Sequence, residues 1–160
     1  MKKVMFVCLG NICRSPIAEA VFNHLVDQKG LSKKYMADSS GTSAFHIGAD
    51  PDPRMSMTAD KKGVFMNHRA QQFKKEHFDK FDYIFAMDKS NFEDVISMTQ
   101  NAKLREKVYL LRQYDLKASS SRADVPDPYY RGGLEAFDEV FDIVYRSCEE
   151  ILNNMENGSI

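Results

Sequence analysis

The sequence has no long apolar run and almost no net charge, and each of these absences excludes a class of proteins. No hydrophobic stretch approaches the roughly 20 residues that a membrane-spanning helix needs. Lys2 and Lys3 lead into a short apolar segment rather than into the longer one of a secretory signal peptide. The net charge of −1 provides no general attraction to nucleic acid or to an anionic membrane. We therefore expect a cytoplasmic protein that binds neither, although export by a route without a signal peptide would fit the same sequence.

Cysteine and histidine are scarce as well, which argues against two further kinds of protein. The three cysteines are an odd number, which does not suit the disulfide framework of a secreted protein. Together with the four histidines they show no spacing typical of a metal site, so we expect no metal and no cofactor. The 160 residues, 43% of them hydrophobic and 28% charged, fit one globular domain over residues 1–160. We expect a monomer, with a weak dimer as the alternative.

Short apolar segments alternate with helical patterns along the chain, and this order predicts an α/β fold. We expect strands over residues 3–7, 35–40, 81–87 and 107–111. We expect helices after the first strand, over residues 53–62 and 90–99, and after Gly133. Ser15 should cap the first of these helices, and Pro16 should be its first residue. Right-handed crossovers then give a single doubly wound, four-stranded parallel sheet flanked by helices.

The segment Cys8-Leu9-Gly10-Asn11-Ile12-Cys13-Arg14-Ser15 lies between the first strand and the first helix. A loop in this position turns backbone N–H groups inward at the positive end of a helix dipole, which makes a cradle for an anion. Cys8 at its mouth should be a nucleophilic thiolate, and Arg14 has the planar guanidinium that fits two phosphate oxygens. Gly10 and Asn11 tolerate positive φ. The segment therefore predicts the phosphate-binding loop of a phosphatase that works through a phosphocysteine, whereas a small buried Cys8 is the simpler alternative.

The same segment, together with Val7 and Pro16, resembles the phosphate loop of low-molecular-weight protein tyrosine phosphatases. Four further segments match the family in the same order and at similar separations: residues 38–42, 68–70, 82–88 and 127–130. The resemblance covers nearly the whole chain, and the cysteine loop and the Asp-Pro-Tyr-Tyr segment are highly specific together. It implies a phosphotyrosine phosphatase that acts on tyrosine-phosphorylated proteins or peptides.

Asp127 is the expected general acid, because the phenolate that leaves a phosphotyrosine needs a proton. An aspartate before proline is often only a turn residue, but the resemblance implies that Asp127 is the acid and later the base. The resemblance also implies an aromatic and apolar slot around the substrate. Its walls should be Leu9, Ile12, Phe45, His46, Tyr129 and Tyr130. The family often has Trp or Tyr where this chain has Phe45, so the peptide preference of the slot stays open.

A group of polar residues is expected, by the same resemblance, to support the loop. Its members are Asn11, Ser15, Ser39, His68 and Asp88. Asn11 would hold a left-handed loop residue through hydrogen bonds to the others, and Ser15 would donate to the Cys8 thiolate. Asp88 would orient Arg14, unless it is simply a surface aspartate.

The two remaining cysteines have different expected roles. Cys13 is either a resolving thiol that captures oxidised Cys8 as a disulfide or a small buried side chain. Cys148 belongs to an apolar stripe of the last helix that starts at Leu134, and we expect it in the core.

Three other functions compete with phosphotyrosine hydrolysis. Protein-arginine phosphatases of the family resemble this chain but have Thr where it has Ile12. Thioredoxin-linked arsenate reduction would need further cysteines on a mobile segment, and residues 60–110 contain none. A non-catalytic phosphotyrosine-binding module would not need Cys8, Arg14 and Asp127 together. We therefore favour the tyrosine phosphatase.

Overall fold

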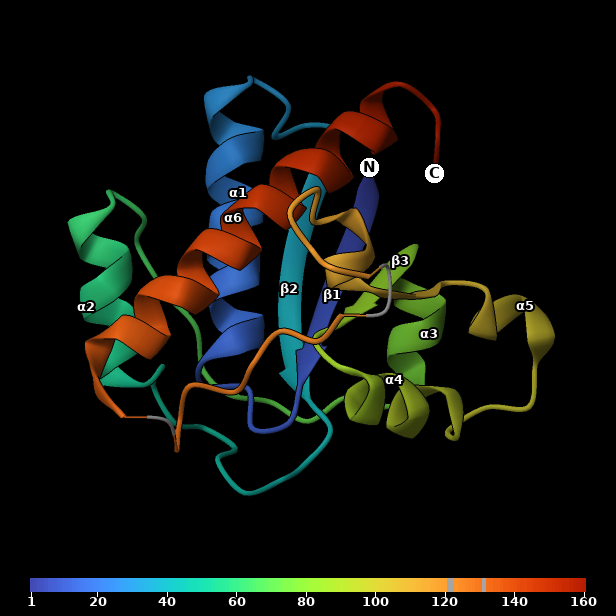
Figure 1. Ribbon diagram of the computed structural model, residues 1–160. Coiled ribbons are helices and arrows are strands. Elements are labelled where there is room, and N and C mark those ends of the chain that lie inside the picture. Colours follow the sequence, from blue (N-terminus) through green and yellow to red (C-terminus); the bar gives the residue numbers. More distant parts are fainter. Residues whose placement is uncertain (121–122, 131) are drawn as a thin grey trace.

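The computed structural model describes residues 1–120, 123–130 and 132–160 and has an α/β fold (Figure 1). Within these residues, one parallel sheet of four strands has the order β2-β1-β3-β4. The strands are β1 (Lys2–Cys8), β2 (Tyr35–Gly41), β3 (Tyr83–Ala86) and β4 (Val108–Leu110). The chain passes from β1 to β2 and then returns past β1 to β3, so the strand order reverses beside β1. The expected parallel sheet is confirmed, and the end of β1 is where such folds bind ligands.

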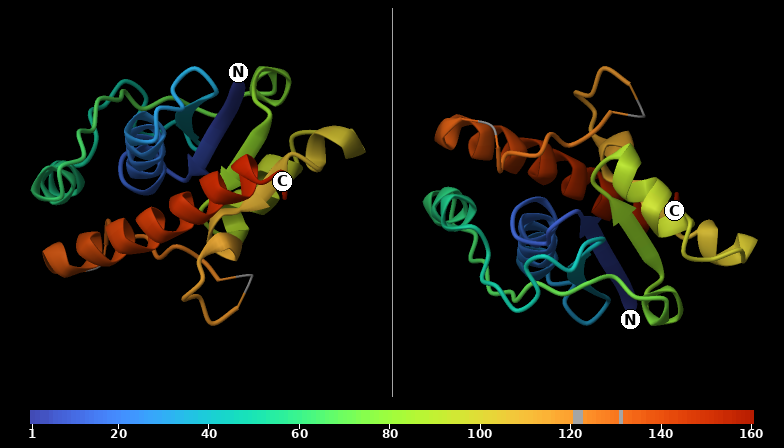
Figure 2. Two further views of the ribbon diagram at one scale, coloured as in Figure 1. Left: turned by 90° about the horizontal axis from the view of Figure 1, so that it is seen from above. Right: turned by 90° about the horizontal axis from the view of Figure 1, so that it is seen from below.

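Helices cover both faces of the sheet, as the alternating pattern predicted (Figure 2). They are α1 (Arg14–Gln28), α2 (Pro53–Lys61), α3 (Glu76–Lys80), α4 (Lys89–Ile96), α5 (Ala102–Arg105), the 3₁₀ helix η1 (Leu111–Tyr114) and α6 (Gly133–Glu156). The sequence did not indicate α3 and α5, because helices of five and four residues are too short to show a periodic pattern.

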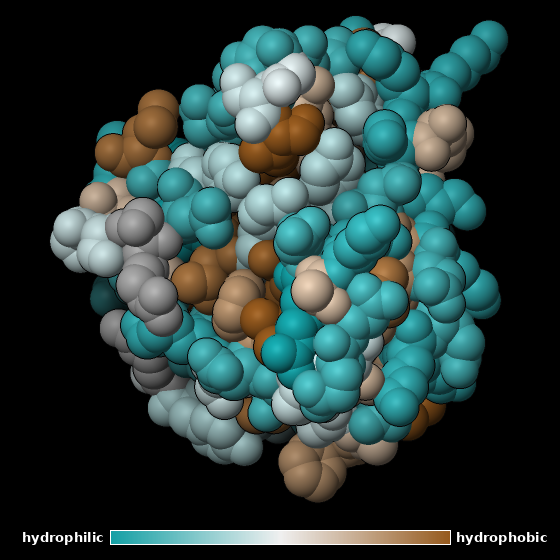
Figure 3. Space-filling view, turned by 90° about the vertical axis from the view of Figure 1, so that its right-hand side faces the viewer, coloured by the Kyte–Doolittle hydropathy of each residue, from teal (hydrophilic) through white to brown (hydrophobic). Residues whose placement is uncertain are grey.

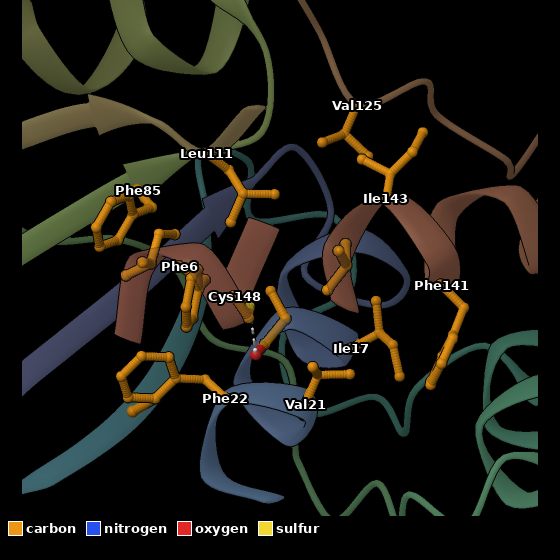
Figure 4. Packing of buried hydrophobic residues seen from close by; sticks show 14 of the residues in the cluster. Phe6, Ile17, Val21, Phe22, Phe85, Leu111, Val125, Phe141, Ile143 and Cys148 are labelled. Carbon is orange, nitrogen blue, oxygen red and sulfur yellow. Dashed lines mark hydrogen bonds between the residues drawn. The ribbon is translucent and has the colours of Figure 1, made fainter. Parts of the chain in front are cut away.

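The larger part of the core lies between the sheet and the helices α1 and α6 (Figure 4). The ring of Phe6 in β1 lies 5.9 Å from that of Phe22 in α1 and 5.7 Å from that of Phe85 in β3. Cys148 of α6 is fully buried here, with its Sγ 3.8 Å from the carbonyl oxygen of Ala18. Burial raises the pKa of the Cys148 thiol, and its expected core position is confirmed.

The opposite face of the sheet packs against α3 and α4 through a second cluster. Its buried members are Met5, Val7, Phe73, Phe78, Phe81, Ile84, Val95 and Val108. Residues 4–8 of β1 are therefore buried on both faces, which is typical of a strand inside a parallel sheet. On the outside, the face in Figure 3 is largely hydrophilic, with hydrophobic residues in small separate groups. None of the helices in the described part of the chain has the length and hydropathy of a membrane span.

The start of α1 differs from the prediction at Ser15. The helix begins at Arg14, so Pro16 is its third residue and not its first as predicted. Cys13 is the N-cap residue, and no side chain of the described residues caps the helix. Ser15 lies inside the first turn, where its hydroxyl contacts the side chains of Cys8 and Asn11. The predicted cap is therefore wrong, because the loop before the helix engages the hydroxyl that would have formed it.

Two boundaries also differ from the sequence-based expectation. The third strand begins at Tyr83 rather than at Phe81, because the amide of Phe81 donates to the carbonyl of His77 and so ends α3. Leu134 is exposed, because the buried face of α6 begins only at Ala136.

Candidate active site

A pocket of about 100 Å³ opens at the end of β1, between three loops that are far apart in the sequence. The Cys8 loop (residues 8–15) follows β1, a second loop follows β2, and a third precedes α6; all three lie at the lower end of the sheet in Figure 1. The pocket is lined by Cys8, Leu9, Gly10, Ile12, Cys13, Arg14, Ser43, Phe45, His46, Asp127, Tyr129 and Tyr130. Apart from Ser43, which belongs to no motif, these are residues that the sequence placed at the site.

The Cys8 loop is bonded to neighbouring segments through carbonyl groups, while one of its amides is directed at the Cys8 sulfur. The carbonyl oxygens of Cys8 and Ile12 accept hydrogen bonds from the amides of Thr42 and Asp52 at 2.9 and 2.8 Å. The amide of Asn11 donates to Cys8 Sγ at 3.2 Å. In a loop of this kind, N–H dipoles direct their positive ends at the centre of the loop, as the binding of an anion requires.

Backbone geometry explains why small and amide residues occupy this loop. Asn11 has a φ of 58°, the left-handed conformation that asparagine adopts more readily than most residues. Gly10 does not carry the positive φ; a Cβ there would lie 3.0 Å from the ring of His46. Gly41 at the end of β2 is constrained more strictly, since its Cβ would lie 2.7 Å from a backbone atom, the carbonyl oxygen of Leu9.

The side chain of Asn11 ties the loop to the rest of the fold. Its Nδ2 donates to Ser15 Oγ at 2.8 Å and to Ser39 Oγ at 3.1 Å. Its Oδ1 accepts from the amide of Gln71 at 2.8 Å and lies 2.7 Å from His68 Nε2. The expected grouping of Asn11, Ser15, Ser39 and His68 is thus present.

Two members of this network were missed by the sequence reasoning. Glu19 accepts from Ser39 Oγ at 2.7 Å and lies 3.0 Å from His68 Nδ1. Its position four residues after Ser15, on the first helix, was the available signal. Gln71 takes part through its backbone amide, which gives no side-chain signal.

Within the described part of the chain, the Cys8 sulfur has two hydrogen-bond contacts, and both come from its own loop. Cys8 is 2% exposed, and its Sγ lies 3.0 Å from Ser15 Oγ and 3.2 Å from the amide nitrogen of Asn11. Cys8 thus belongs to the edge of the larger core cluster and also lines the pocket, where its sulfur has polar contacts.

Arg14 is buried, and its guanidinium is oriented by an aspartate that follows another strand of the sheet. Its NH1 donates to Asp88 Oδ2 at 2.7 Å and to the carbonyl oxygen of Val125 at 3.1 Å. Asp88 also caps α4, since its Oδ1 accepts from the amide of Asn91 at 2.7 Å. Burial disfavours the charge of Arg14, but Cys8 and the neighbouring carboxylates outweigh it and raise the pKa of the guanidinium.

Asp127 faces the pocket from the loop before α6. Its Oδ1 accepts from the amide of Tyr129 at 3.1 Å, and its Oδ2 lies 3.5 Å from Arg14 NH2. The ring of Tyr129 lies 6.2 Å from that of His46 and meets Tyr130 edge-on at 4.7 Å. The three segments that carry these residues thus converge on one opening.

The aromatic residues at the mouth differ in how far they are covered. Phe45 and Tyr130 are 84% and 87% exposed, so both stand at the rim, whereas Tyr129 and Ile12 are partly buried. The expected wall is therefore a partly buried lining with an exposed aromatic rim.

Cys13 lies beside the site and is nearly buried. Burial, together with the nearby Asp52 and Cys8, raises the pKa of the Cys13 thiol. Both Cys8 and Cys13 are free thiols and line the same pocket.

One group of side chains in the described segments has the composition and spacing to hold a cation: Glu19, Asp38 and His68, whose ligand atoms lie within 4.8 Å of one another. Their oxygen and nitrogen atoms contact Ser39, Gln71 and Asn11 as part of the network above. We therefore interpret the group as structural.

Residues 3–159 match the sequence model of a family described as low molecular weight phosphotyrosine protein phosphatase. The chain belongs to this family. It is 43% identical, over 94% of each chain, to the low molecular weight phosphotyrosine protein phosphatase of Homo sapiens. It is also similar to the crystal structure of a protein tyrosine phosphatase from Entamoeba histolytica with Hepes in the active site, with a TM-score of 0.94 and 35% identity over both whole chains. A Drosophila arginine phosphatase is similar as well, with a TM-score of 0.89 and 33% identity over 98% of each chain.

The family resemblance that the Cys8 loop and the Asp-Pro-Tyr-Tyr segment suggested is therefore confirmed. The family is one of phosphatase enzymes, so the chain is an enzyme of this class. The solved relatives include phosphatases named for tyrosine and for arginine, which leaves the substrate to be argued from the pocket.

Proposed function

We propose that the chain is a protein-tyrosine phosphatase that hydrolyses phosphotyrosine through a phosphocysteine on Cys8, and that residues 1–160 form one catalytic domain. The observation that carries this proposal is the position of Cys8 Sγ beneath the pocket, 3.2 Å from the amide of Asn11 and close to the N-terminus of α1. A nucleophile there lies where the loop amides and the helix dipole would bring the phosphorus of a bound monoester.

In the first step, the Cys8 thiolate attacks phosphorus, so that an S–P bond forms as the P–O bond to the leaving group breaks. Asn11 N–H and Ser15 O–H are placed to solvate the negative sulfur. Arg14 binds two phosphoryl oxygens and stabilises their developing charge. Asp127 donates a proton to the leaving oxygen, so tyrosine departs as a neutral phenol.

In the second step, Asp127 takes a proton from water, and the resulting hydroxide attacks the phosphocysteine. The S–P bond breaks, inorganic phosphate leaves, and Cys8 returns to the thiolate. In these steps Asp127 is both the acid and the base, Cys8 is the nucleophile of the first step, and water is the nucleophile of the second. The hydrogen bond from Tyr129 N–H to Asp127 Oδ1 leaves Oδ2 directed toward Arg14 and the pocket, in a position suited to both transfers.

The substrate class follows from the depth and the lining of the pocket. Cys8 is 2% exposed at the base, whereas Phe45 and Tyr130 stand exposed at the rim. A phenyl ring spans such a slot and packs against Ile12 and Tyr129, whereas a serine methylene is too short to bring phosphorus to the sulfur. Tyrosine-phosphorylated proteins or peptides are therefore the proposed substrates. The cytoplasm is the proposed location of the enzyme.

Hydrolysis of phosphoarginine is the second candidate, because the chain is 33% identical to a Drosophila arginine phosphatase. Ile12 offers the cationic, polar guanidinium of phosphoarginine no hydrogen-bond partner, which favours the aryl substrate. Arsenate reduction is less well supported, since the third cysteine, Cys148, is fully buried in the core and cannot relay electrons without local unfolding.

Replacement of the nucleophile is the first test. Cys8→Ser should fold normally and keep phosphate or vanadate binding, because the cradle is intact, but turnover should fall by a factor on the order of 10³ or more. Cys13→Ser is the matched control and should retain most of the activity. Steady-state kinetics on a phosphotyrosine peptide provide the measurement, and a Cys8→Ser variant with a tenth of wild-type turnover would contradict the assignment.

The second test concerns oxidation, for which we propose that Cys13 is a resolving thiol. Peroxide converts the Cys8 thiolate to a sulfenic acid, and Cys13 then displaces water to form a disulfide, which blocks further oxidation. Peptide mapping by mass spectrometry after mild peroxide treatment should identify the Cys8–Cys13 disulfide. Addition of a thiol reagent should restore the activity of the oxidised wild type but not that of oxidised Cys13→Ser. Equal recovery of activity in the two proteins would refute the protective role.

The third test is substrate selectivity. Matched peptides that differ only in the phosphorylated residue should show kcat/KM about 100-fold or more higher for phosphotyrosine than for phosphoserine, because proximity to Cys8 is lost with the shorter side chain. Comparable values would overturn the slot argument. Faster phosphate release from a phosphoarginine peptide would favour the second candidate instead.

The fourth test assigns the proton donor through leaving-group dependence. Asp127→Ala should slow phosphotyrosine, whose phenol has a pKa of about 10, by about 10²–10⁴-fold, and should slow an activated nitrophenyl ester far less. A plot of log kcat/KM against leaving-group pKa should be nearly flat for the wild type and steeply negative for the variant. Parallel lines would remove Asp127 from the proton transfer, with Asp88 the next carboxylate to replace.

A further inference from the structure

We propose that Arg54 is a positioning residue, which holds the Asp127 loop (residues 127–130) in place against the Cys8 loop. The inference rests on the proposed function, because it assigns to Arg54 the task of fixing the carboxyl group that transfers the proton. Arg54 lies in the first turn of α2 and does not line the pocket.

One side of Arg54 is fixed to the Cys8 loop through Asp52. The Asp52 carboxylate is nearly buried and accepts from Arg54 Nε at 3.0 Å and from NH2 at 2.8 Å, a two-pronged pairing that only arginine can make. It also accepts from the amide of Arg54 at 2.9 Å, which caps α2. The amide of Asp52 donates to the carbonyl of Ile12 at 2.8 Å, so the pair is anchored to the Cys8 loop.

The other side of Arg54 contacts the Asp127 loop. Its guanidinium lies 5.5 Å from the centroid of the Tyr129 ring and 4.6 Å from that of Phe137, a fully buried residue of α6. Its NH2 also donates to the carbonyl oxygen of Tyr129 at 3.4 Å. Arg54 therefore holds Tyr129 both by its ring and by its backbone.

Tyr129 passes this constraint to the carboxyl group. Its amide donates to Asp127 Oδ1 at 3.1 Å, while its carbonyl accepts from Arg54. Upstream of Asp127 the loop has other attachments, since Arg14 donates to the carbonyl of Val125 and the amide of Val125 donates to the carbonyl of Met87. Downstream, Arg54 supplies the corresponding attachment. Proton transfer is sensitive to displacements below 1 Å. Loss of the attachment to Arg54 would therefore displace the Asp127 carboxyl group without removing it.

A purely structural ion pair on the surface would have a different signature. Exposed ion pairs contribute little to stability, and the loss of one should change kcat/KM for all substrates by the same factor. Displacement of the general acid, in contrast, lowers kcat/KM more for a substrate whose leaving group is more basic. Leaving-group dependence therefore distinguishes the two roles.

The test compares Arg54→Met, which keeps the stem without the charge, with Arg54→Lys, which keeps the charge without the planar fork. Arg54→Met should lower kcat/KM for a phosphotyrosine peptide about 10-fold to 100-fold and that for nitrophenyl phosphate less than about 3-fold, with phosphate inhibition unchanged. Arg54→Lys should fall between Arg54→Met and the wild type, and it tests the same dependence if Arg54→Met does not fold. Arg105→Met is the matched control, since Arg105 also donates to a loop carbonyl, that of Thr99, but lies away from the pocket.

Asp127→Ala, measured in parallel, separates the inference from the function on which it rests. In the Asp127→Ala background, Arg54→Met should not steepen the leaving-group dependence any further, because the acid that Arg54 positions is gone. Equal losses on both substrates, or weaker phosphate inhibition, would show that Arg54 acts through the Cys8 loop and would overturn the inference. The inference would also be overturned if Arg54→Met folds and keeps the wild-type slope of log kcat/KM against leaving-group pKa while Asp127→Ala gives a steep slope. If Asp127→Ala itself keeps the wild-type slope, the assigned acid is wrong.

Discussion

The hydrogen bonds of one amide side chain, that of Asn11, keep the Cys8 loop in the conformation on which the site depends. A left-handed residue costs about 1–2 kcal/mol, and each buried hydrogen bond contributes about 0.5–1.5 kcal/mol. Asn11 contacts Ser15, Ser39, His68 and the amide of Gln71, so its partners outweigh the cost of its φ of 58°. Because these partners come from α1, β2 and the segment before α3, folding of the domain also assembles the loop, with the Asn11 amide directed at Cys8 Sγ.

Parallel strand pairing brings the remaining groups to the same place. Val7 of β1 is paired with Ala86 of β3, and the carbonyl of Val7 accepts from the amide of Met87 at 3.0 Å. The carbonyl of Met87 then accepts from Val125 at 2.8 Å, so the hydrogen-bonding pattern extends from the sheet to the loop that carries Asp127. Residues more than a hundred positions from Cys8 are in this way positioned by the strand that ends at the cysteine. This arrangement follows from the doubly wound order, in which neighbouring strands end at one edge.

Local order in the sequence was sufficient for the sheet, for the long helices and for the centre of the site. Cys8 and Arg14 lie in one short loop whose conformation depends on its own residues and on its place between a strand and a helix. Contacts between distant segments were harder to predict. Gln71 contributes a backbone amide, which every residue type except proline offers, and the hydroxyl of Ser15 has tertiary partners that a local capping rule does not consider. Arg54 was read only as part of the start of a helix, because its contact with the loop before α6 depends on packing across 75 positions of sequence.

The pairing of Arg14 shows how the fold holds a buried cation in a fixed orientation at the pocket. A buried guanidinium needs a partner, and Asp88 supplies one at 2.7 Å on NH1, where the carbonyl of Val125 also binds. Both of these acceptors use the same nitrogen, whereas among the described residues NH2 has only the long 3.5 Å contact with Asp127. A phosphate group that enters the pocket therefore adds to the pairing of Arg14 instead of replacing it, since the partner that fixes the guanidinium plane stays in place. In the proposed function, in which Arg14 binds the phosphate, its orientation is in this way set during folding, so little of the binding energy of the substrate is required to orient it.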